Sequence, residues 1–113
     1  MKLDVETHND VTVMRVAGEL NADAASKMNP AIDEAFDQAR RDFVIDLSEV
    51  TVIDSKGLEL LTALQRRCEE ELGMVRLCGL DETMRKIFEL TRLDQSLTIV
   101  SSIEEAEASL VQT

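Results

Sequence analysis

A short stretch of the sequence, residues 53–58, sets an acid, a hydroxyl and a glycine together at the start of a predicted helix. Asp54 and Ser55 are adjacent, and Gly57 follows two residues later. The free N–H groups and the dipole of a helix N-terminus favour a phosphate carried by a serine there. Asp54 would repel that phosphate, and the added group would fill the local surface. The pattern therefore predicts a phosphorylation switch at Ser55.

The same residues also have a purely structural interpretation. Ser and Asp are preferred at helix N-caps because their oxygens accept orphan N–H groups, so Ser55 can equally be a cap, with Gly57 in a tight first turn. A second polar loop, residues 18–21 (GELN), follows the first two predicted strands. Functional loops of α/β proteins gather beyond the carboxyl ends of the strands. We therefore expect both loops at one edge of the sheet.

Other kinds of site lack the residues that they need. The sequence has neither a G-x-G-x-x-G nor a G-x4-G-K-S/T pattern for holding phosphates. One histidine, His8, and two separated cysteines, Cys68 and Cys78, do not make a zinc site. We expect both thiols to be buried and reduced, and His8 to be a surface or half-buried strand residue. Without a nucleophile–base pair, the sequence predicts a protein that is not an enzyme and needs no metal or cofactor.

The charge of the chain argues against two classes of partner. Asp and Glu number 23 against 12 Lys and Arg, which gives a net charge of −11. Phosphate backbones and anionic membrane surfaces repel such a protein, so we expect no direct binding to nucleic acid or membrane. We find no signal-peptide pattern and no apolar run near the roughly 20 residues of a membrane span. The sequence therefore predicts a cytoplasmic protein.

The first third of the chain predicts a β-hairpin and a helix. Residues 3–8 and 11–16 are strand-like and are separated by an Asn-Asp turn, and Gly18 is expected to end the second strand. A helical pattern follows over about residues 23–40. Pro30 lies within it, so the helix either kinks there or begins near that proline.

The middle of the chain predicts the strand and the helix that hold Ser55. Residues 43–47 (FVIDL) are apolar on both sides, which is typical of a central strand. Residues 48–57 are expected to form a loop, and a helix from about 55 to 72 follows. Its inner stripe is predicted to carry the following side chains: Leu58, Leu61, Leu64, Cys68 and Leu72. Gly73 is expected to stop this helix.

The remainder predicts strands at 74–78 and 97–100, each followed by a helix. The first of these helices is short, with Met84, Ile87 and Phe88 inward, and the second begins with a capping box of Ser102 and Glu105. Alternating strands and helices imply crossover connections. The fold class is therefore α/β, with a mixed, mostly parallel sheet of about five strands, four helices and an N-terminal hairpin.

The stretch VIDLSEVTVIDSKGL resembles the signature of STAS domains, specifically that of the bacterial anti-sigma-factor antagonists. Residues 18–20 look like the family's G-E-L-D loop, although Asn21 replaces its usual Asp. Residues 54–58 match its D-S-x-G-L phosphorylation motif, with Lys56 at the variable position. Residues 84–93 (MRKIFELTRL) are similar to its V-x-x-x-F-x-x-x-G-L region. The resemblance covers nearly the whole chain and implies one STAS domain over residues 1–113.

The resemblance implies that Ser55 is the phosphoacceptor of a partner switch. The expected partner is an anti-sigma factor that is also a serine kinase of the histidine-kinase-like ATPase type. It would bind the unphosphorylated antagonist and release it on phosphorylation, and a serine phosphatase would reset the switch. The expected partner-binding residues are Glu19, Asn21, Asp54, Ser55, Lys56, Gly57 and Leu58. The alternative is a structural STAS-type subunit of a lipid-transport or other ATPase complex.

Overall fold

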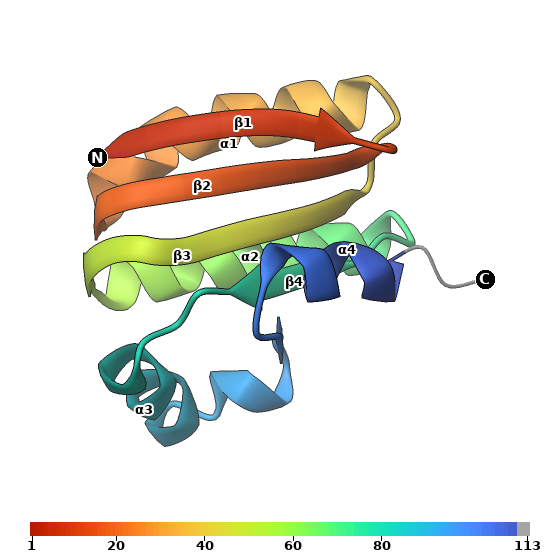
Figure 1. Cartoon of the computed structure of the whole chain (residues 1–113). Coiled ribbons are helices and arrows are strands. Elements are labelled where there is room, and N and C mark those ends of the chain that lie inside the picture. The colour runs from red at the N-terminus through yellow and green to blue at the C-terminus, as the bar shows by residue number, and fades with distance from the viewer. Residues whose placement is uncertain (111–113) are drawn as a thin grey trace.

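Five strands form a single sheet in the computed structural model, which describes residues 1–110 (Figure 1). The strands lie in chain order: β1 (Lys2–His8), β2 (Val11–Leu20), β3 (Asp42–Ile53), β4 (Val75–Cys78) and β5 (Thr98–Ile99). β1 and β2 form an antiparallel hairpin, and every later pair is parallel. The predicted mixed sheet with an N-terminal hairpin is confirmed.

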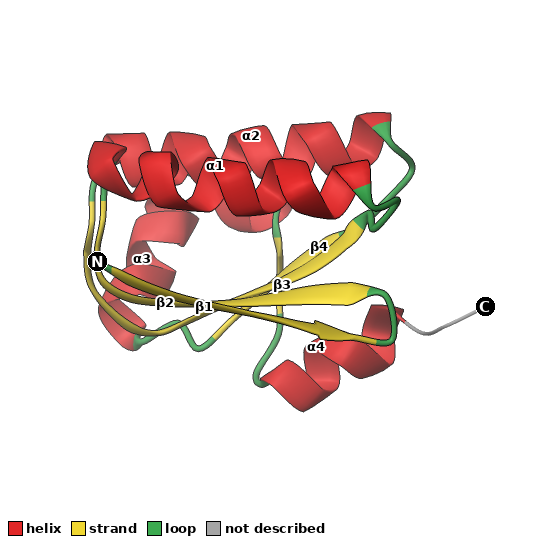
Figure 2. Ribbon diagram, turned by 90° about the horizontal axis from the view of Figure 1, so that it is seen from above, coloured by secondary structure: helices red, strands yellow, loops and turns green. Residues whose placement is uncertain are grey.

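Four helices cover the sheet, as predicted. They are α1 (Ala22–Asp37), α2 (Ser55–Glu70), α3 (Glu82–Leu90) and α4 (Ile103–Leu110), with a short 3₁₀ turn, η1 (Leu93–Gln95), after α3. Figure 2 shows α1 and α2 side by side on one face of the sheet and α4 on the opposite face. The parallel strands β2 and β3 therefore each lead into a helix of the same layer.

The main core lies between the sheet and the α1–α2 layer. Apolar residues recur at helical spacing along α1, where Ala24, Met28, Ile32 and Ala35 are buried. They belong to one cluster with α2, α3 and the inner face of the sheet, in which Phe43 is fully buried. Burying each large apolar side chain contributes about 1.5–3 kcal/mol, so this cluster holds α1 and α2 against the sheet.

A second, smaller core lies under α4. Ala106 and Leu110 of α4 cover Val11, Val13, Val44 and Cys78 on the other face of the sheet. This helix begins with Ser102, whose hydroxyl accepts the backbone N–H of Glu105 at 3.1 Å. The Glu105 carboxylate returns to the backbone N–H of Ser101 rather than to that of Ser102. Both cysteines are free and buried, as expected from the sequence.

Two predicted boundaries, one at a glycine and one at a proline, differ from the structure. Gly18 does not end β2, because the strand continues to Leu20 through a register shift at Gly18, whose φ is +98°. Pro30 neither starts nor divides α1. Proline has no N–H to donate to the carbonyl group four residues earlier in the helix. The Pro30 side chain is exposed, so water can reach that carbonyl, and the helix continues through Pro30.

Residues 48–53 form the second half of β3 rather than a loop. They pair with β2 as far as Leu20 opposite Ile53, beyond a register shift between Arg15 and Ala17. α2 is shorter than predicted, because it ends at Glu70 and Leu72 turns into a left-handed conformation with φ of 63°. Leu72 is therefore 90% exposed and not part of the inner stripe.

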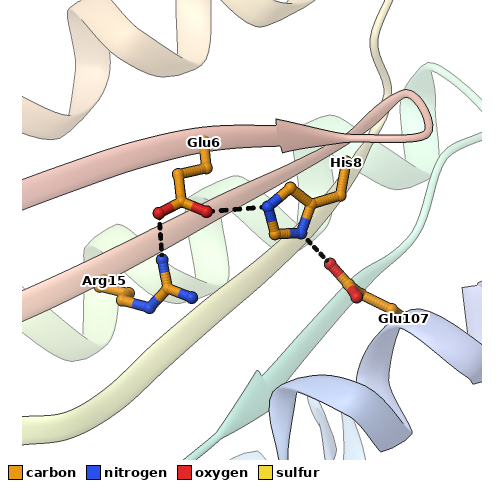
Figure 3. Close-up of polar contacts among 4 residues, drawn as sticks. All are labelled: Glu6, His8, Arg15 and Glu107. Atoms are coloured by element: carbon orange, nitrogen blue, oxygen red, sulfur yellow. Dashed lines mark hydrogen bonds and ion pairs between the residues drawn. The ribbon is translucent and has the colours of Figure 1, made fainter.

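A charged cluster ties α4 to the hairpin (Figure 3). His8, half-buried at the end of β1, contacts Glu107 of α4 through Nδ1 at 2.6 Å and Glu6 through Nε2 at 2.8 Å. Arg15 of β2 donates to the other oxygen of Glu6 at 2.9 Å. Hydrogen bonds to the two carboxylates, that of Glu107 first, raise the pKa of His8. The predicted half-buried position of His8 is confirmed, but its partner in α4 lies far along the sequence.

Candidate functional site

The two polar loops singled out in the sequence lie together at one edge of the sheet. Residues 18–20 are the last residues of β2 rather than a loop, whereas Asp54 and Ser55 directly follow β3. The two strands are parallel neighbours, and Leu20 pairs with Ile53 at the last register position. The backbone N–H of Asp54 donates to the carbonyl oxygen of Leu20 at 3.3 Å. The N-termini of α1 and α2 therefore start from adjacent points, as the sequence predicts for strands that share a carboxyl edge.

Asp54, and not Ser55, is the N-cap of α2. Its Oδ1 accepts the backbone N–H of Gly57 at 2.9 Å, and its backbone is extended, with φ of −111°. Ser55 is then the first helical residue, so the interpretation of Ser55 as a cap is wrong. Its side chain is exposed, and within residues 1–110 its hydroxyl makes no hydrogen bond. The hydroxyl is available for chemistry because its neighbour performs the capping.

Gly57 sets the distance between the two loops. It is buried, and a Cβ atom at this position would lie 2.1 Å from the carbonyl oxygen of Leu20. Such an approach is closer than any side chain allows, so only glycine fits between α2 and the end of β2. Leu58 is half-buried against the main core and anchors the first turn of α2. Gly57 and Leu58 therefore fix the first turn of α2, in which Ser55 lies.

Asn21 performs for α1 the capping that Asp54 performs for α2. Its Oδ1 accepts the backbone N–H of Asp23 at 3.0 Å, and its amide donates to Glu19 at 3.4 Å. Asn and Asp are about equally good N-caps, so Asn21 caps α1 as an aspartate at this position would. Glu19 itself is exposed beside this cap.

The exposed surface around Ser55 is mostly anionic. Glu19 lies near the end of β2 and Asp54 directly follows β3, and each brings a carboxylate to this edge. Lys56 forms a contact of 3.4 Å with Glu59 one turn along α2. Lys56 therefore points its charge along the helix toward a carboxylate of its own chain. Two helix N-termini supply partial positive charge at the same edge, which gives a phosphate on Ser55 a favourable backbone environment.

Of the seven residues predicted to bind a partner, four have exposed side chains: Glu19, Asp54, Ser55 and Lys56. Asn21 and Leu58 are half-buried, and Gly57 is buried. Val52, an aliphatic residue that is 55% exposed, lies at the same edge and was not among the candidates. Its position could not be predicted, because the pattern of residues 48–53 indicates a loop, whereas they belong to β3.

Residues 1–110 contain no group of three or more His, Cys, Asp or Glu arranged to hold a metal ion. Within the same range, no helix has the length and apolar character needed to cross a membrane.

The chain is similar to several known bacterial proteins. The anti-sigma-F factor antagonist RsfB of Mycobacterium tuberculosis is 29% identical over 102 residues, which cover 90% of this chain and 83% of RsfB. The crystal structure of an anti-sigma factor antagonist from Mycobacterium paratuberculosis superposes with a TM-score of 0.85 at 27% identity, covering 98% and 94% of the two chains. The Bacillus cell fate determinant SpoIIAA, solved in its phosphorylated form, has a TM-score of 0.75 at 24% identity, covering 96% and 98%.

The family itself follows from a match over most of the chain. The sequence model of the STAS domain matches residues 2–106, which include all five strands and the exposed serine at the start of α2. The relatives named above are anti-sigma factor antagonists or share their fold. This chain belongs to the STAS domain family, and the resemblance seen in its sequence is confirmed.

Proposed function

We propose that this protein is an anti-sigma factor antagonist that works by partner switching, with Ser55 as the switch. The observation that supports it most directly is the exposed Ser55 hydroxyl in the first turn of α2, left free because Asp54 caps the helix. In its unphosphorylated form the domain binds a cognate anti-sigma factor. Phosphorylation of Ser55 releases that partner.

A phosphate on Ser55 is stable on the domain and unfavourable in an interface. It adds about −1.5 to −2 charges near neutral pH. The N–H groups at the start of α2 favour this charge, whereas the Asp54 carboxylate beside it adds repulsion. Covering the phosphate with a partner removes its water and costs several kcal/mol where the partner offers no matching group. A loss of about 3 kcal/mol weakens binding roughly a hundredfold, without any change in fold.

The proposed partners follow from the family. The anti-sigma factor is a serine kinase of the histidine-kinase-like ATPase type, and a separate serine phosphatase restores the free hydroxyl. The antagonist is a substrate and a competitor, and it catalyses no reaction itself. We place the protein in the cytoplasm as a single domain. The proposed partner-binding residues around Ser55 are Glu19, Asn21, Asp54, Lys56, Gly57 and Leu58. SpoIIAA, of the same fold, has been solved in a phosphorylated form, which supports a phosphoprotein.

The experiment is phosphate mapping in a lysate of the protein's own cells. Purified protein is incubated with ATP and lysate, and modified residues are located by mass spectrometry. Wild type is compared with Ser55→Ala and with Ser96→Ala. The second variant removes an exposed hydroxyl just after η1. We expect phosphate on Ser55 that only Ser55→Ala abolishes. Unmodified Ser55 in lysates from several growth conditions would overturn the proposal and favour the structural-subunit alternative.

A binding measurement tests the switch itself. Ser55→Ala should bind the isolated kinase as wild type does, and Ser55→Asp should bind it more weakly, because a carboxylate supplies part of the phosphate charge. Equal affinities for the two variants would contradict partner switching.

A further inference from the structure

The second half of β3 has a strand partner on one side only. β4 pairs with β3 from Phe43 to Asp46 and then ends, whereas β2 follows β3 to Ile53. Where β4 has ended, the backbone N–H of Ser48 donates to the Asp46 carboxylate at 3.0 Å. Within residues 1–110, the side of β3 that faces away from β2 therefore has no strand partner over residues 49–53. Free strand edges of this kind are available to another chain.

A hollow of about 320 Å³ lies between this open edge and α3. In Figure 1, α3 lies below the end of β3 from which the chain enters α2. Val52 and Ile53 line the hollow from β3, and Met84 and Ile87 line it from α3. Val52 is 55% exposed although it is aliphatic and part of a strand. This groove has apolar walls and lies next to Asp54 and Ser55 in the chain, so it extends the candidate site toward α3.

The charges at the groove are those of carboxylates. Asp81 lines it at the start of α3, with Glu82 exposed beside it, and Glu19 is the register partner of Val52. Asp81 Oδ1 accepts the backbone N–H of Met84 at 2.8 Å, which holds its carboxylate at the mouth of the groove. Arg85 does not neutralise this end, because it lines a separate hollow on α3 that also contains Glu89 and Asp94.

From these observations we propose that the groove between β3 and α3 receives an aliphatic side chain from a basic segment of the protein partner. The aliphatic group packs on Val52 and Ile87, and a neighbouring Lys or Arg pairs with Asp81. This inference rests on the proposed function, since the partner is the anti-sigma factor. Ser55 lies two residues beyond Ile53, which lines the groove, so the groove adjoins the proposed switch residue along the chain.

The test uses variants of the full chain in a Ser55→Ala background, so that phosphorylation does not intervene. The probe is the ATPase captured from lysate on Ser55→Ala protein, then purified, and affinity is measured by calorimetry. Val52→Asp removes the apolar contact, and Thr83→Trp fills the groove from the exposed side of α3. Asp81→Asn removes the charge and keeps the helix cap, because Asn and Asp cap about equally well.

Two control variants make the same chemical changes elsewhere. Leu72→Asp places a carboxylate on another exposed aliphatic residue, at the end of α2 remote from Ser55, and Asp37→Asn removes an exposed charge at the end of α1. We expect Val52→Asp and Thr83→Trp to weaken binding about tenfold or more, and Asp81→Asn to weaken it less and to reduce its salt dependence. Both controls should remain within about twofold of the Ser55→Ala parent. Circular dichroism confirms that every variant is folded.

The outcomes separate this inference from the proposed function. If the ATPase phosphorylates wild-type Ser55 but binds the groove variants as tightly as their parent, the groove proposal is overturned and the switch stands. If the groove variants lose binding but Ser55 is never phosphorylated, the switch is overturned and the groove stands. Failure to capture any ATPase, or capture of a membrane transporter in its place, overturns both.

Discussion

Gly57 of α2 and Leu20 of β2 join the two loops of the candidate site through their backbones. A Cβ atom at residue 57 would lie 2.1 Å from the Leu20 carbonyl oxygen, and the same oxygen accepts the N–H of Asp54 at 3.3 Å. A single carbonyl group therefore sets the position of both the cap and the first turn of α2. The exposure of Ser55 depends on this contact as much as on the motif around it.

Gly57→Ala should displace the first turn of α2 and destabilise the protein. The methyl group meets backbone atoms, which cannot move aside as a flexible side chain can, so we expect a loss of about 2 kcal/mol or more in the free energy of unfolding. Urea titration measures the loss, and Ala63→Ser on the exposed side of the same helix is the control. The rate of Ser55 phosphorylation should fall in Gly57→Ala alone. An unchanged urea midpoint would contradict the close contact.

Asp54→Ala should cost about 1 kcal/mol, because the backbone N–H of Gly57 loses its acceptor. Asp54→Asn is the matched variant, since an amide oxygen caps as well and only the charge–dipole attraction of about 0.5 kcal/mol is lost. Thermal or urea unfolding of the two variants distinguishes cap from charge. Equal losses in both would mean that the carboxylate charge, and not the hydrogen bond to Gly57, stabilises the start of α2.

The hairpin, the parallel sheet and the position of Ser55 could be predicted because local patterns determine them. Asn9 and Asp10 adopt positive φ in the tight turn between two β-branched runs, as turn chemistry favours. The order of elements after the hairpin allows few topologies. Which of Asp54 and Ser55 caps α2 could not be predicted, because both residue types are good caps and only the three-dimensional contact with Leu20 decides between them.

Other features depend on contacts that a local pattern does not contain. Ser48 and Glu49 interrupt the apolar run after Leu47, so the sequence pattern predicts the end of the strand there. A register shift against β2 lets β3 continue. That continuation creates both the open edge and the exposed Val52. Likewise, helical periodicity extends to Leu72, but the chain leaves the helix before it and exposes that side chain.

The two cysteine thiols should react slowly in the native protein and quickly after unfolding. Burial raises the pKa of Cys68 to about 12 and that of Cys78 to about 11, so almost no thiolate is present near pH 8. A time course with iodoacetamide, read by mass spectrometry, measures both sites. Cys78 should be labelled first, because it lies in the smaller core under the short helix α4, whereas Cys68 lies in the main core. Labelling of both at the rate of the urea-unfolded chain would contradict their burial.

The contacts of His8 predict that α4 is held more firmly at acidic pH than at alkaline pH. Both ring nitrogens face carboxylates, Glu107 at 2.6 Å and Glu6 at 2.8 Å, and only the protonated imidazole can donate to both. Because these bonds raise the pKa of His8 above its unfolded value, its contribution is fully present below about pH 6.5 and is lost as the pH rises through the folded pKa. Glu6 acts in the opposite direction. Its pKa is lowered, first by its hydrogen bond to His8, so its contribution is lost as the pH falls through that lowered pKa.

The measurement is the unfolding free energy of wild type and His8→Gln from about pH 5.5 to 8.5, with hydrogen exchange of the α4 amides at each pH. Glutamine keeps a donor for one carboxylate but cannot titrate, so the difference between the two proteins should be largest at the acidic end and shrink as the pH rises. Protection of α4 should follow the same curve, because Glu107 is the contact from that helix. Lys2→Gln, which removes a cation from the far end of β1, should leave the curve unchanged. A difference that is constant with pH would mean that the imidazole does not titrate in this range and that packing alone holds α4 on the sheet.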